Sequence, residues 1–269
     1  NFYKGWTTTI TDETSHTKTL TKDAYERLRS DKEKNGPEEY TTNYTYDALD
    51  NLTQITDHFG NRFEFSYDTL KRRTAMTDPD FGAWAYEYDN NGNLTKITNA
   101  KAEITNLTYD QINRLLSKDY LSYPGVGAAY NYDEAGSTNG IGRRTSMSDI
   151  SGSSRWDYDK EGRAIKLQKT VDANTYKVEW AYDAMDRVKS IIYPNLKQVN
   201  FYYNNAGLAE SIDGFVLHAD YNAASQPTAI TFSNPMTTQF DYYPENQRLK
   251  SIVTTSWQDL RYEYDIVGN

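Results

Sequence analysis

Short segments in which apolar and polar residues alternate recur along the whole chain. In one of them, Phe63, Phe65 and Tyr67 alternate with Glu64 and Ser66. An alternation with a period of two predicts a β-strand that has one apolar face. The sequence therefore predicts a protein built largely from short strands.

Many of these segments end in a tyrosine that is followed by an aspartate. The pairs are Tyr46 and Asp47, Tyr67 and Asp68, Tyr88 and Asp89, Tyr109 and Asp110, Tyr132 and Asp133, Tyr158 and Asp159, Tyr182 and Asp183, and Tyr264 and Asp265. Degenerate copies are predicted at Tyr203-Asn204, Tyr221-Asn222, Tyr243-Pro244 and Lys22-Asp23. Successive tyrosines from Tyr46 onward are 18 to 26 residues apart, most often 21, so the chain is predicted to be an internal repeat.

Each repeat is predicted to contain two strands and two turns. Asp89 to Asn93 is typical of a tight turn, because Gly and Asn accept a positive φ angle. A second strand is predicted at Leu94 to Thr98, and another turn at Asn99 to Lys101 precedes the next alternating segment. A repeat is thus a β-hairpin linked to the next hairpin.

The second strand of a repeat departs from simple alternation. Its apolar residues are spaced three apart, as in the pairs Leu52 and Ile55, Leu94 and Ile97, and Val188 and Ile191. A regular strand would place two such residues on opposite faces. We expect a β-bulge or a strong local twist to bring them to one face. Partial covering of both faces is the alternative.

The tyrosines and aspartates of the repeats are predicted to be structural residues. The tyrosines end aromatic stripes that are expected to lie side by side as ladders in neighbouring repeats. Each aspartate is expected to accept hydrogen bonds from backbone N–H groups one or two residues later, a role that Asn204 and Asn222 can also fill. A platform for stacking sugars or bases is the alternative for the tyrosines. Repetition at regular spacing argues against catalytic or metal-binding aspartates.

The composition favours an all-β protein. Aromatic residues make up 14% of the chain and tyrosines number 24, while no apolar run approaches the length of a membrane helix. The net charge of -9 argues against a nucleic-acid partner. No cysteine is present, so disulfides and thiolate metal sites are excluded.

No catalytic, cofactor-binding or metal-binding residues are predicted. The three histidines, His16, His58 and His218, lie far apart and lack the spacing of metal ligands. The turn at Asp89 lacks the remaining ligands of a calcium loop. Two Gly-containing insertions, Tyr123 to Gly127 and Ala135 to Gly140, are expected to be surface connections first and binding loops second.

The repeated motifs resemble the RHS/YD-repeat family. The resemblance rests on segments such as Tyr88 to Leu94 and Tyr182 to Val188, and on Gly140 to Ser146, and it extends from about Thr19 to Asn269. The family includes bacterial Rhs polymorphic toxins, the C component of insecticidal toxin complexes, and teneurins. The resemblance implies a long antiparallel sheet that curves or spirals as part of a hollow shell. In the bacterial members the shell encloses a C-terminal toxin.

The sequence thus predicts a non-catalytic shell or scaffold segment. Residues 1–18 are expected to end a preceding repeat or linker, and residues 19–269 to form about twelve repeats of a longer chain. The expected partners are an enclosed effector or toxin, other segments of the same shell, or further copies paired through strand edges. The chain is expected to be secreted or displayed at the cell surface. An extracellular adhesion or carbohydrate-binding module and a self-assembling β filament are the alternatives.

Overall fold

The computed structural model describes residues 2–4, 6–265 and 268. Within these ranges the chain forms 25 β-strands joined by turns and contains no helix. No segment of the described chain is therefore a helix long and apolar enough to cross a membrane. The prediction of an all-β chain of tandem antiparallel hairpins is confirmed. The start of the repeat region at residue 19 stays a prediction.

The chain divides into two compact units, residues 1–130 and residues 131–269. The strands of unit 1 are β1 (Phe2–Lys4), β2 (Thr7–Thr11), β3 (Thr17–Lys22), β4 (Leu28–Asn35), β5 (Glu38–Tyr46), β6 (Leu52–Thr56), β7 (Arg62–Tyr67), β8 (Arg73–Asp78), β9 (Gly82–Tyr88), β10 (Leu94–Thr98), β11 (Ile104–Tyr109) and β12 (Leu115–Tyr120). The boundary falls within β13 (Ala128–Tyr132). Unit 2 continues with β14 (Arg144–Asp149), β15 (Gly152–Tyr158), β16 (Ala164–Val171), β17 (Asn174–Tyr182), β18 (Val188–Ile192), β19 (Gln198–Tyr203), β20 (Ala209–Ile212), β21 (Val216–Tyr221), β22 (Pro227–Phe232), β23 (Thr237–Tyr242), β24 (Leu249–Thr254) and β25 (Gln258–Arg261).

The strand register separates an aromatic face from a polar face. Tyr44 lies opposite Ile55, which in turn lies opposite Phe63, so these apolar residues share one face of the sheet. We call this the aromatic face; in unit 1 it comprises Tyr44, Tyr46, Leu52, Ile55, Phe63, Phe65, Tyr67, Met76, Trp84, Tyr86, Tyr88, Leu94, Ile97, Leu107, Tyr109 and Tyr120. In unit 2 it includes Trp156, Leu167, Val178, Trp180, Ile191, Val199 and Phe201. The other face carries Thr, Ser and charged residues, among which Thr108 and Ser117 are hydrogen-bonded at 2.8 Å.

In most hairpins the second strand has a β-bulge beside the last tyrosine of the first strand. Tyr46 lies opposite Leu52 and Thr45 opposite Gln54, which leaves Thr53 as the extra residue. The bulge keeps Leu52 on the aromatic face, so the bulge predicted from the apolar spacing is confirmed. The register shifts in the same way at Lys22, Tyr67, Tyr88, Tyr109, Tyr158, Tyr182, Tyr203, Tyr221 and Tyr242.

The aromatic residues do not form the side-by-side ladders that the sequence predicts. Phe65 lies opposite Met76, and Met76 lies opposite Trp84, so an aliphatic residue separates the two rings. The reason is that the aromatic stripe belongs to the first strand of each hairpin, whereas the second strand supplies aliphatic residues. In this row, aromatic and aliphatic side chains therefore alternate.

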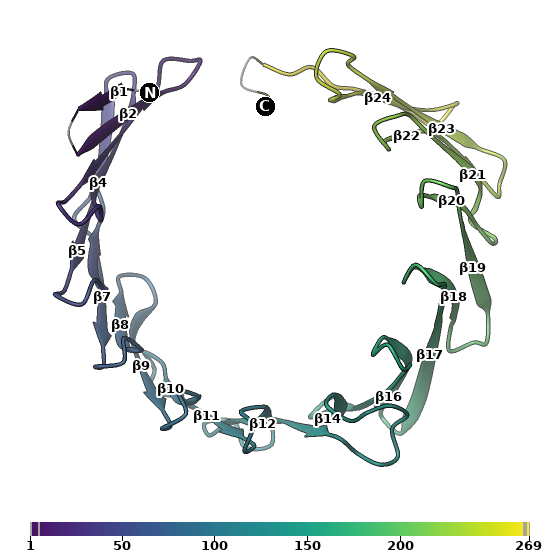
Figure 1. Cartoon of the computed structure of the whole chain (residues 1–269), viewed down its shortest axis with the longest axis horizontal. Coiled ribbons are helices and arrows are strands. Elements are labelled where there is room, and N and C mark those ends of the chain that lie inside the picture. The colour runs from purple at the N-terminus through teal and green to yellow at the C-terminus, as the bar shows by residue number, and fades with distance from the viewer. Residues whose placement is uncertain (1, 5, 266–267, 269) are drawn as a thin grey trace. The chain divides into compact units, whose positions relative to one another are not determined.

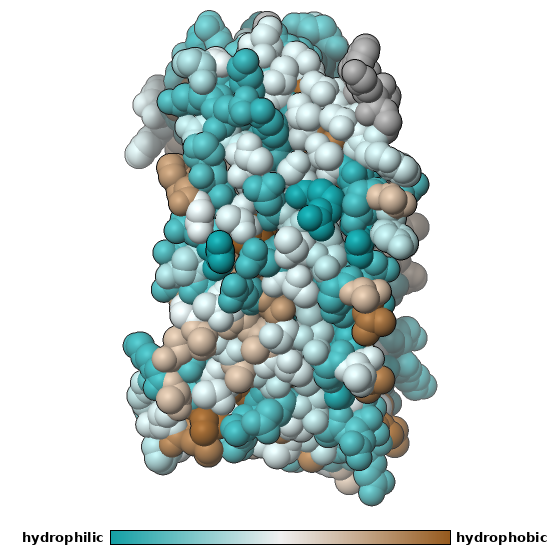
Figure 2. All heavy atoms as spheres, turned by 90° about the vertical axis from the view of Figure 1, so that its left-hand side faces the viewer, coloured by the Kyte–Doolittle hydropathy of each residue, from teal (hydrophilic) through white to brown (hydrophobic). Residues whose placement is uncertain are grey.

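The strands of unit 1 follow one another along a curved strip (Figure 1). Figure 2 looks at the convex side of this strip, where the middle is mainly teal and pale and the brown residues lie mostly toward the margins. Few strongly hydrophobic residues are therefore seen over the middle of this side.

The sheet has little conventional core. Among the described residues, Val199 and Ala219 are the only apolar side chains that are buried. In a chain of this length a covered aromatic face would normally form a large core. The structure therefore leaves most of the aromatic face half-exposed, without a second layer over it.

The last degenerate repeat is shifted by one residue from its predicted position. Tyr242, not Tyr243, ends β23 opposite Leu249 and takes the place of the repeat tyrosine. Tyr243 takes the place of the aspartate and begins a longer turn, in which its N–H donates to the carbonyl of Arg248. Two adjacent tyrosines satisfy the sequence pattern equally well, and only the bulge at Tyr242 distinguishes them.

Candidate functional site

The aspartate of each Tyr-Asp pair organises the turn that follows it. One carboxylate oxygen of Asp47 accepts hydrogen bonds from the N–H groups of Leu49 and Asn51, both at 2.9 Å. Asp23, Asp68, Asp89, Asp110 and Asp183 accept the same two bonds, from the residues two and four positions later. The second bond reaches farther along the chain than the sequence predicts.

The same turn requires a left-handed backbone three residues after the aspartate. The φ angle is 67° at Asp50, 62° at Lys71 and 89° at Gly92. Only glycine adopts this conformation without a steric cost. The hydrogen bonds to the aspartate hold the other residues in it.

Asparagine fills the role of the aspartate in two degenerate repeats. Asn204 accepts hydrogen bonds from the N–H groups of Ala206 and Leu208, both at 3.0 Å. Asn222 does the same with Ala224 at 2.9 Å and Gln226 at 3.0 Å. The predicted equivalence of Asn and Asp in these turns is therefore seen in the geometry.

The residue four positions after the aspartate closes the turn with its side chain. In several repeats it is an arginine whose Nε donates to the second carboxylate oxygen, as in the Arg163–Asp159 pair at 2.6 Å. In two others it is an asparagine, as in Asn51 with Asp47 at 2.8 Å. The hydrogen bond from the Asn51 side chain lowers the pKa of Asp47 below its ordinary value. The Arg187 guanidinium lowers the pKa of Asp183 in the same way.

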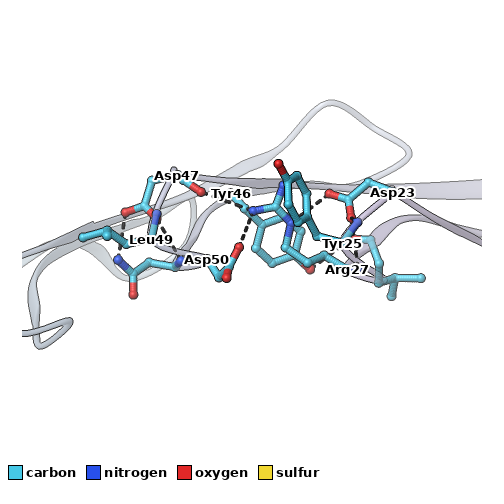
Figure 3. Close-up of polar contacts among 9 residues, drawn as sticks. Asp23, Tyr25, Arg27, Tyr46, Asp47, Leu49 and Asp50 are labelled. Carbon is cyan, nitrogen blue, oxygen red and sulfur yellow. Dashed lines mark hydrogen bonds and ion pairs between the residues drawn. The ribbon is translucent and has the colours of Figure 1, made fainter.

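The closing arginine also joins one repeat to the next, as Figure 3 shows for the first such pair. The Arg27 guanidinium, bound to Asp23, lies 5.0 Å from the centre of the Tyr46 ring and donates to Asp50 Oδ1 at 2.7 Å. An arginine held over an aromatic ring is attracted by the ring's π electrons. Equivalent stacking joins Arg72 to Tyr88, Arg163 to Tyr182, Arg187 to Tyr203 and Arg248 to Tyr264.

The repeat tyrosine reaches back to the preceding hairpin. The Tyr46 hydroxyl donates to the carbonyl of Leu28, the first residue of β4, at 3.0 Å. The carbonyl at the equivalent position is the acceptor for Tyr88, Tyr109, Tyr158, Tyr182, Tyr203, Tyr221, Tyr242 and Tyr264. The tyrosine and the arginine together form a link between successive hairpins, which we call the repeat clasp.

The predicted repeat residues therefore form a series and not a single centre. Asp47 and Asp68 each belong to the turn of a different hairpin, and each is bound within its own turn. The clasp connects successive hairpins. The sequence missed the closing arginine and the tyrosine hydroxyl. The recurrence of Arg or Asn four residues after Asp was the available signal.

The three histidines lie in separate places. His16 Nδ1 lies 3.1 Å from Asp12 Oδ2, and His218 Nε2 lies 3.1 Å from Asp220 Oδ1. The centre of the His58 ring lies 5.3 Å from that of the Tyr40 ring. The described part of the chain brings no three His, Asp or Glu side chains together in a way that could hold a metal ion.

The two insertions behave differently from each other. Ala135 to Gly140 packs against the next hairpin, where buried Ser137 donates to the carbonyl of Trp156 and the N–H of Thr138 donates to Asp157 at 2.9 Å. Only Ser137 and Gly140 of this segment are buried, so it is the surface connection that the sequence predicts, anchored to the next hairpin. Tyr123 to Gly127 also lies at the surface and borders a pocket in unit 1.

Comparison with known proteins identifies the repeats. Residues 59–212, more than half of the chain, match the model of the teneurin YD-shell. No curated protein matches the chain. Solved structures share its fold: one of the TcdB2-TccC3 complex has a TM-score of 0.88 at 19% identity and covers 100% of this chain. The complex TcdB2-TccC3-Cdc42 gives 0.87 at 18% identity over 99% of this chain.

A pore structure of the Photorhabdus luminescens Tc holotoxin also matches, with a TM-score of 0.85 at 18% identity over 100% of this chain. The chain spans only 16% to 17% of the length of these solved chains. The family match confirms the resemblance that the Tyr-Asp motifs indicate. The chain therefore belongs to the teneurin YD-shell family.

Proposed function

We propose that this chain is a section of a shell wall that encloses another polypeptide, such as a toxin or effector. Membership of the YD-shell family gives the chain a structural role in a shell. The enclosed polypeptide is the further step. The observation that carries it is the aromatic face, which the described chain leaves without a covering layer.

The physical argument concerns what this face would contact. Tyr, Trp and Phe side chains alternate with aliphatic ones across the face, and most are half-exposed. Large apolar surfaces of this kind are rarely left in water and mark interaction sites. A polypeptide held against the aromatic face would cover them, while the polar face with its Thr, Ser and charged residues would face solvent.

The repeat clasp supports the proposal of a wall, because it connects successive hairpins through their side chains. The clasp of Arg163 and Tyr182, for example, ties a hairpin to the next through an ion pair, a stacked guanidinium and a tyrosine hydrogen bond. We propose a structural and non-catalytic role for this wall. Export to the cell surface or beyond belongs to the same proposal.

Thiol labelling of the full-length gene product tests the proposal. The chain has no cysteine, so Met76→Cys on the aromatic face and Ser66→Cys on the polar face each introduce the one thiol of this chain. Cysteines elsewhere in the product would be replaced. A small maleimide should label both variants, whereas a bulky polyethylene-glycol maleimide should label only Ser66→Cys until denaturant opens the shell.

Equal labelling of both variants by the bulky reagent would contradict an enclosed aromatic face. Electron cryomicroscopy of the same product gives a separate readout for the cargo. The expected result is a hollow body with density inside it. A hollow body that is empty in every class would leave the shell in place but remove the enclosed polypeptide.

A further inference from the structure

Three asparagines of the chain stand directly before a glycine: Asn35, Asn91 and Asn139. In this dipeptide the side chain can react with the backbone, because glycine has no Cβ to hinder the approach. The glycine nitrogen loses its proton and attacks the asparagine Cγ, the bond from Cγ to the side-chain nitrogen breaks, and ammonia leaves. Water then opens the resulting succinimide ring to aspartate or isoaspartate. The reaction needs no enzyme, so its rate depends on the freedom of the two reacting groups.

Asn35 and Gly36 lie at the exposed tip of the β4–β5 hairpin. Asn35 is the last residue of β4, opposite Glu38, and Gly36 has a φ angle of 60°. Within the described ranges, neither the Asn35 side-chain amide nor the Gly36 N–H group has a hydrogen-bond partner. A Cβ at Gly36 would meet no atom within 4 Å. Opening of the last strand pair is therefore enough to let the Gly36 nitrogen reach the asparagine Cγ.

Asn91 is exposed as well, but the backbone around it is engaged. It lies in the turn of Asp89, whose carbonyl accepts a hydrogen bond from the Gly92 N–H at 3.1 Å. The N–H of Asn91 itself donates to Asp89 Oδ1 at 2.9 Å. The Gly92 nitrogen can attack only after its hydrogen bond breaks. Asn91 should therefore react more slowly than Asn35.

Asn139 is held on both sides. Its side-chain nitrogen donates to the carbonyl of Tyr158 at 2.9 Å, and its own carbonyl accepts a hydrogen bond from Arg143 at 3.1 Å. The following Gly140 is buried, and a Cβ there would lie 2.5 Å from Thr145 Cγ2. The amide cannot turn toward the Gly140 nitrogen without losing these contacts.

We propose that Asn35 is a site of spontaneous deamidation in the native protein, and that the fold protects Asn139 from the same reaction. The product places a carboxylate opposite Glu38, and like charges opposite each other on paired strands are unfavourable. Isoaspartate also adds one methylene group to the backbone. The modification should therefore loosen the tip of the β4–β5 hairpin. The inference does not depend on the shell enclosing a cargo.

Peptide mapping by mass spectrometry tests the site. The full-length gene product is incubated at mildly alkaline pH in its native state and in denaturant, and each Asn-Gly peptide is followed over time. In the native state Asn35 should react fastest and Asn139 slowest. The two rates should differ at least about tenfold, which corresponds to a local opening free energy of about 1.4 kcal/mol. In denaturant the three rates should converge. Asn35→Gln, in which ring closure is slower, should remove the product at this position and leave the Asn91 rate unchanged.

Three results would overturn the proposal. One is an equal rate at Asn35 and Asn139 in the native protein. Another is a native Asn35 that stays intact while the denatured protein reacts. The third is a slow reaction at Asn139 that persists in denaturant, because the neighbouring sequence and not the fold would then protect it.

Discussion

At the residue scale, the two residues of the Tyr-Asp pair make hydrogen bonds in two different hairpins. Asp183 binds the N–H groups of its own turn, whereas the Tyr182 hydroxyl binds the carbonyl of Ala164 in the preceding hairpin. The Arg163 guanidinium also connects the two hairpins, because it is bound to Asp159 and lies 4.7 Å from the centre of the Tyr182 ring. One repeated dipeptide therefore sets both the local turn and the contact between repeats.

Tyr182→Phe tests the backward hydrogen bond. The ring and its stacking stay, while the partly buried carbonyl of Ala164 loses its donor at 2.9 Å. A hydrogen bond of this kind contributes about 1 kcal/mol, so the free energy of unfolding should fall by about that amount. Urea unfolding measures it. Tyr176→Phe, at an exposed position, is the control and should change stability by less than about 0.5 kcal/mol.

The turn aspartates predict a loss of stability in acid. Hydrogen bonds from Asn51 and Asn93 lower the folded-state pKa of Asp47 and Asp89 below that of the unfolded chain. The unfolded chain therefore binds protons first, so stability is fully present above about pH 4 and falls as the pH drops through the folded pKa values.

Urea midpoints measured between pH 2 and 7 check this dependence. An Asp89→Asn variant should keep its turn, as Asn204 and Asn222 do, and should show a shallower decline in acid. A steeper decline in that variant would contradict the role of the carboxylate.

At the element scale, each hairpin is fixed by a bulge at one end of its second strand and a left-handed residue in the turn before it. In the β5–β6 pair, Thr53 is the extra residue of the bulge, and Asp50 has the left-handed backbone conformation. A one-residue slip in register would move the apolar residues to the polar face. The bulge and turn together prevent that slip.

Substitutions at the left-handed position test this account. Gly92 has φ of 89° with open space where a Cβ would lie, so Gly92→Ala adds backbone strain and no clash. The expected cost is about 1 kcal/mol in the free energy of unfolding. Lys71→Gly at the equivalent position should be neutral or slightly stabilising, since relief of strain opposes the greater unfolded-state entropy. Equal destabilisation by both changes would argue against the turn geometry.

At the scale of the whole molecule, the chain is a member of the YD-shell family in which each described strand contacts its immediate neighbours along the sheet. Stability in such an array is approximately a sum of repeat terms and neighbour terms. A destabilising substitution is therefore expected to unfold only its own repeat and the neighbouring repeats. The division into two units supports separate behaviour of residues 1–130 and 131–269.

Gly152→Val tests this locality. A Cβ at Gly152 would lie 1.9 Å from the carbonyl oxygen of Thr170, so β15 and β16 must separate. Hydrogen exchange should lose protection in these strands and their neighbours, while the strands of unit 1 keep theirs. Ser153→Val, on the same strand but exposed, is the control. Loss of protection throughout unit 1 would show that the whole chain unfolds as one.

Much of the fold could be predicted because it depends on local pattern. Alternation gave the strands, and the spacing of Leu52 and Ile55 gave the bulge. The clasp could not be predicted in this way, since the contact between Arg27 and Tyr46 depends on the register between hairpins. The burial of Ser137 likewise depends on a hairpin that follows later in the chain.

The bulge beside the repeat tyrosine also bears on how chain length varies among related proteins. Insertion or deletion of one residue inside a strand exchanges the two faces for the residues that follow in that strand. Gain or loss of a complete hairpin leaves the faces, turns and clasps of the other hairpins in place. Natural variation in length should therefore come in steps of about one 21-residue unit, the commonest spacing of the tyrosines. The extra lengths of other spacings should lie in turns, as the two insertions here do. Duplication of whole hairpins is then the simplest way for this architecture to grow.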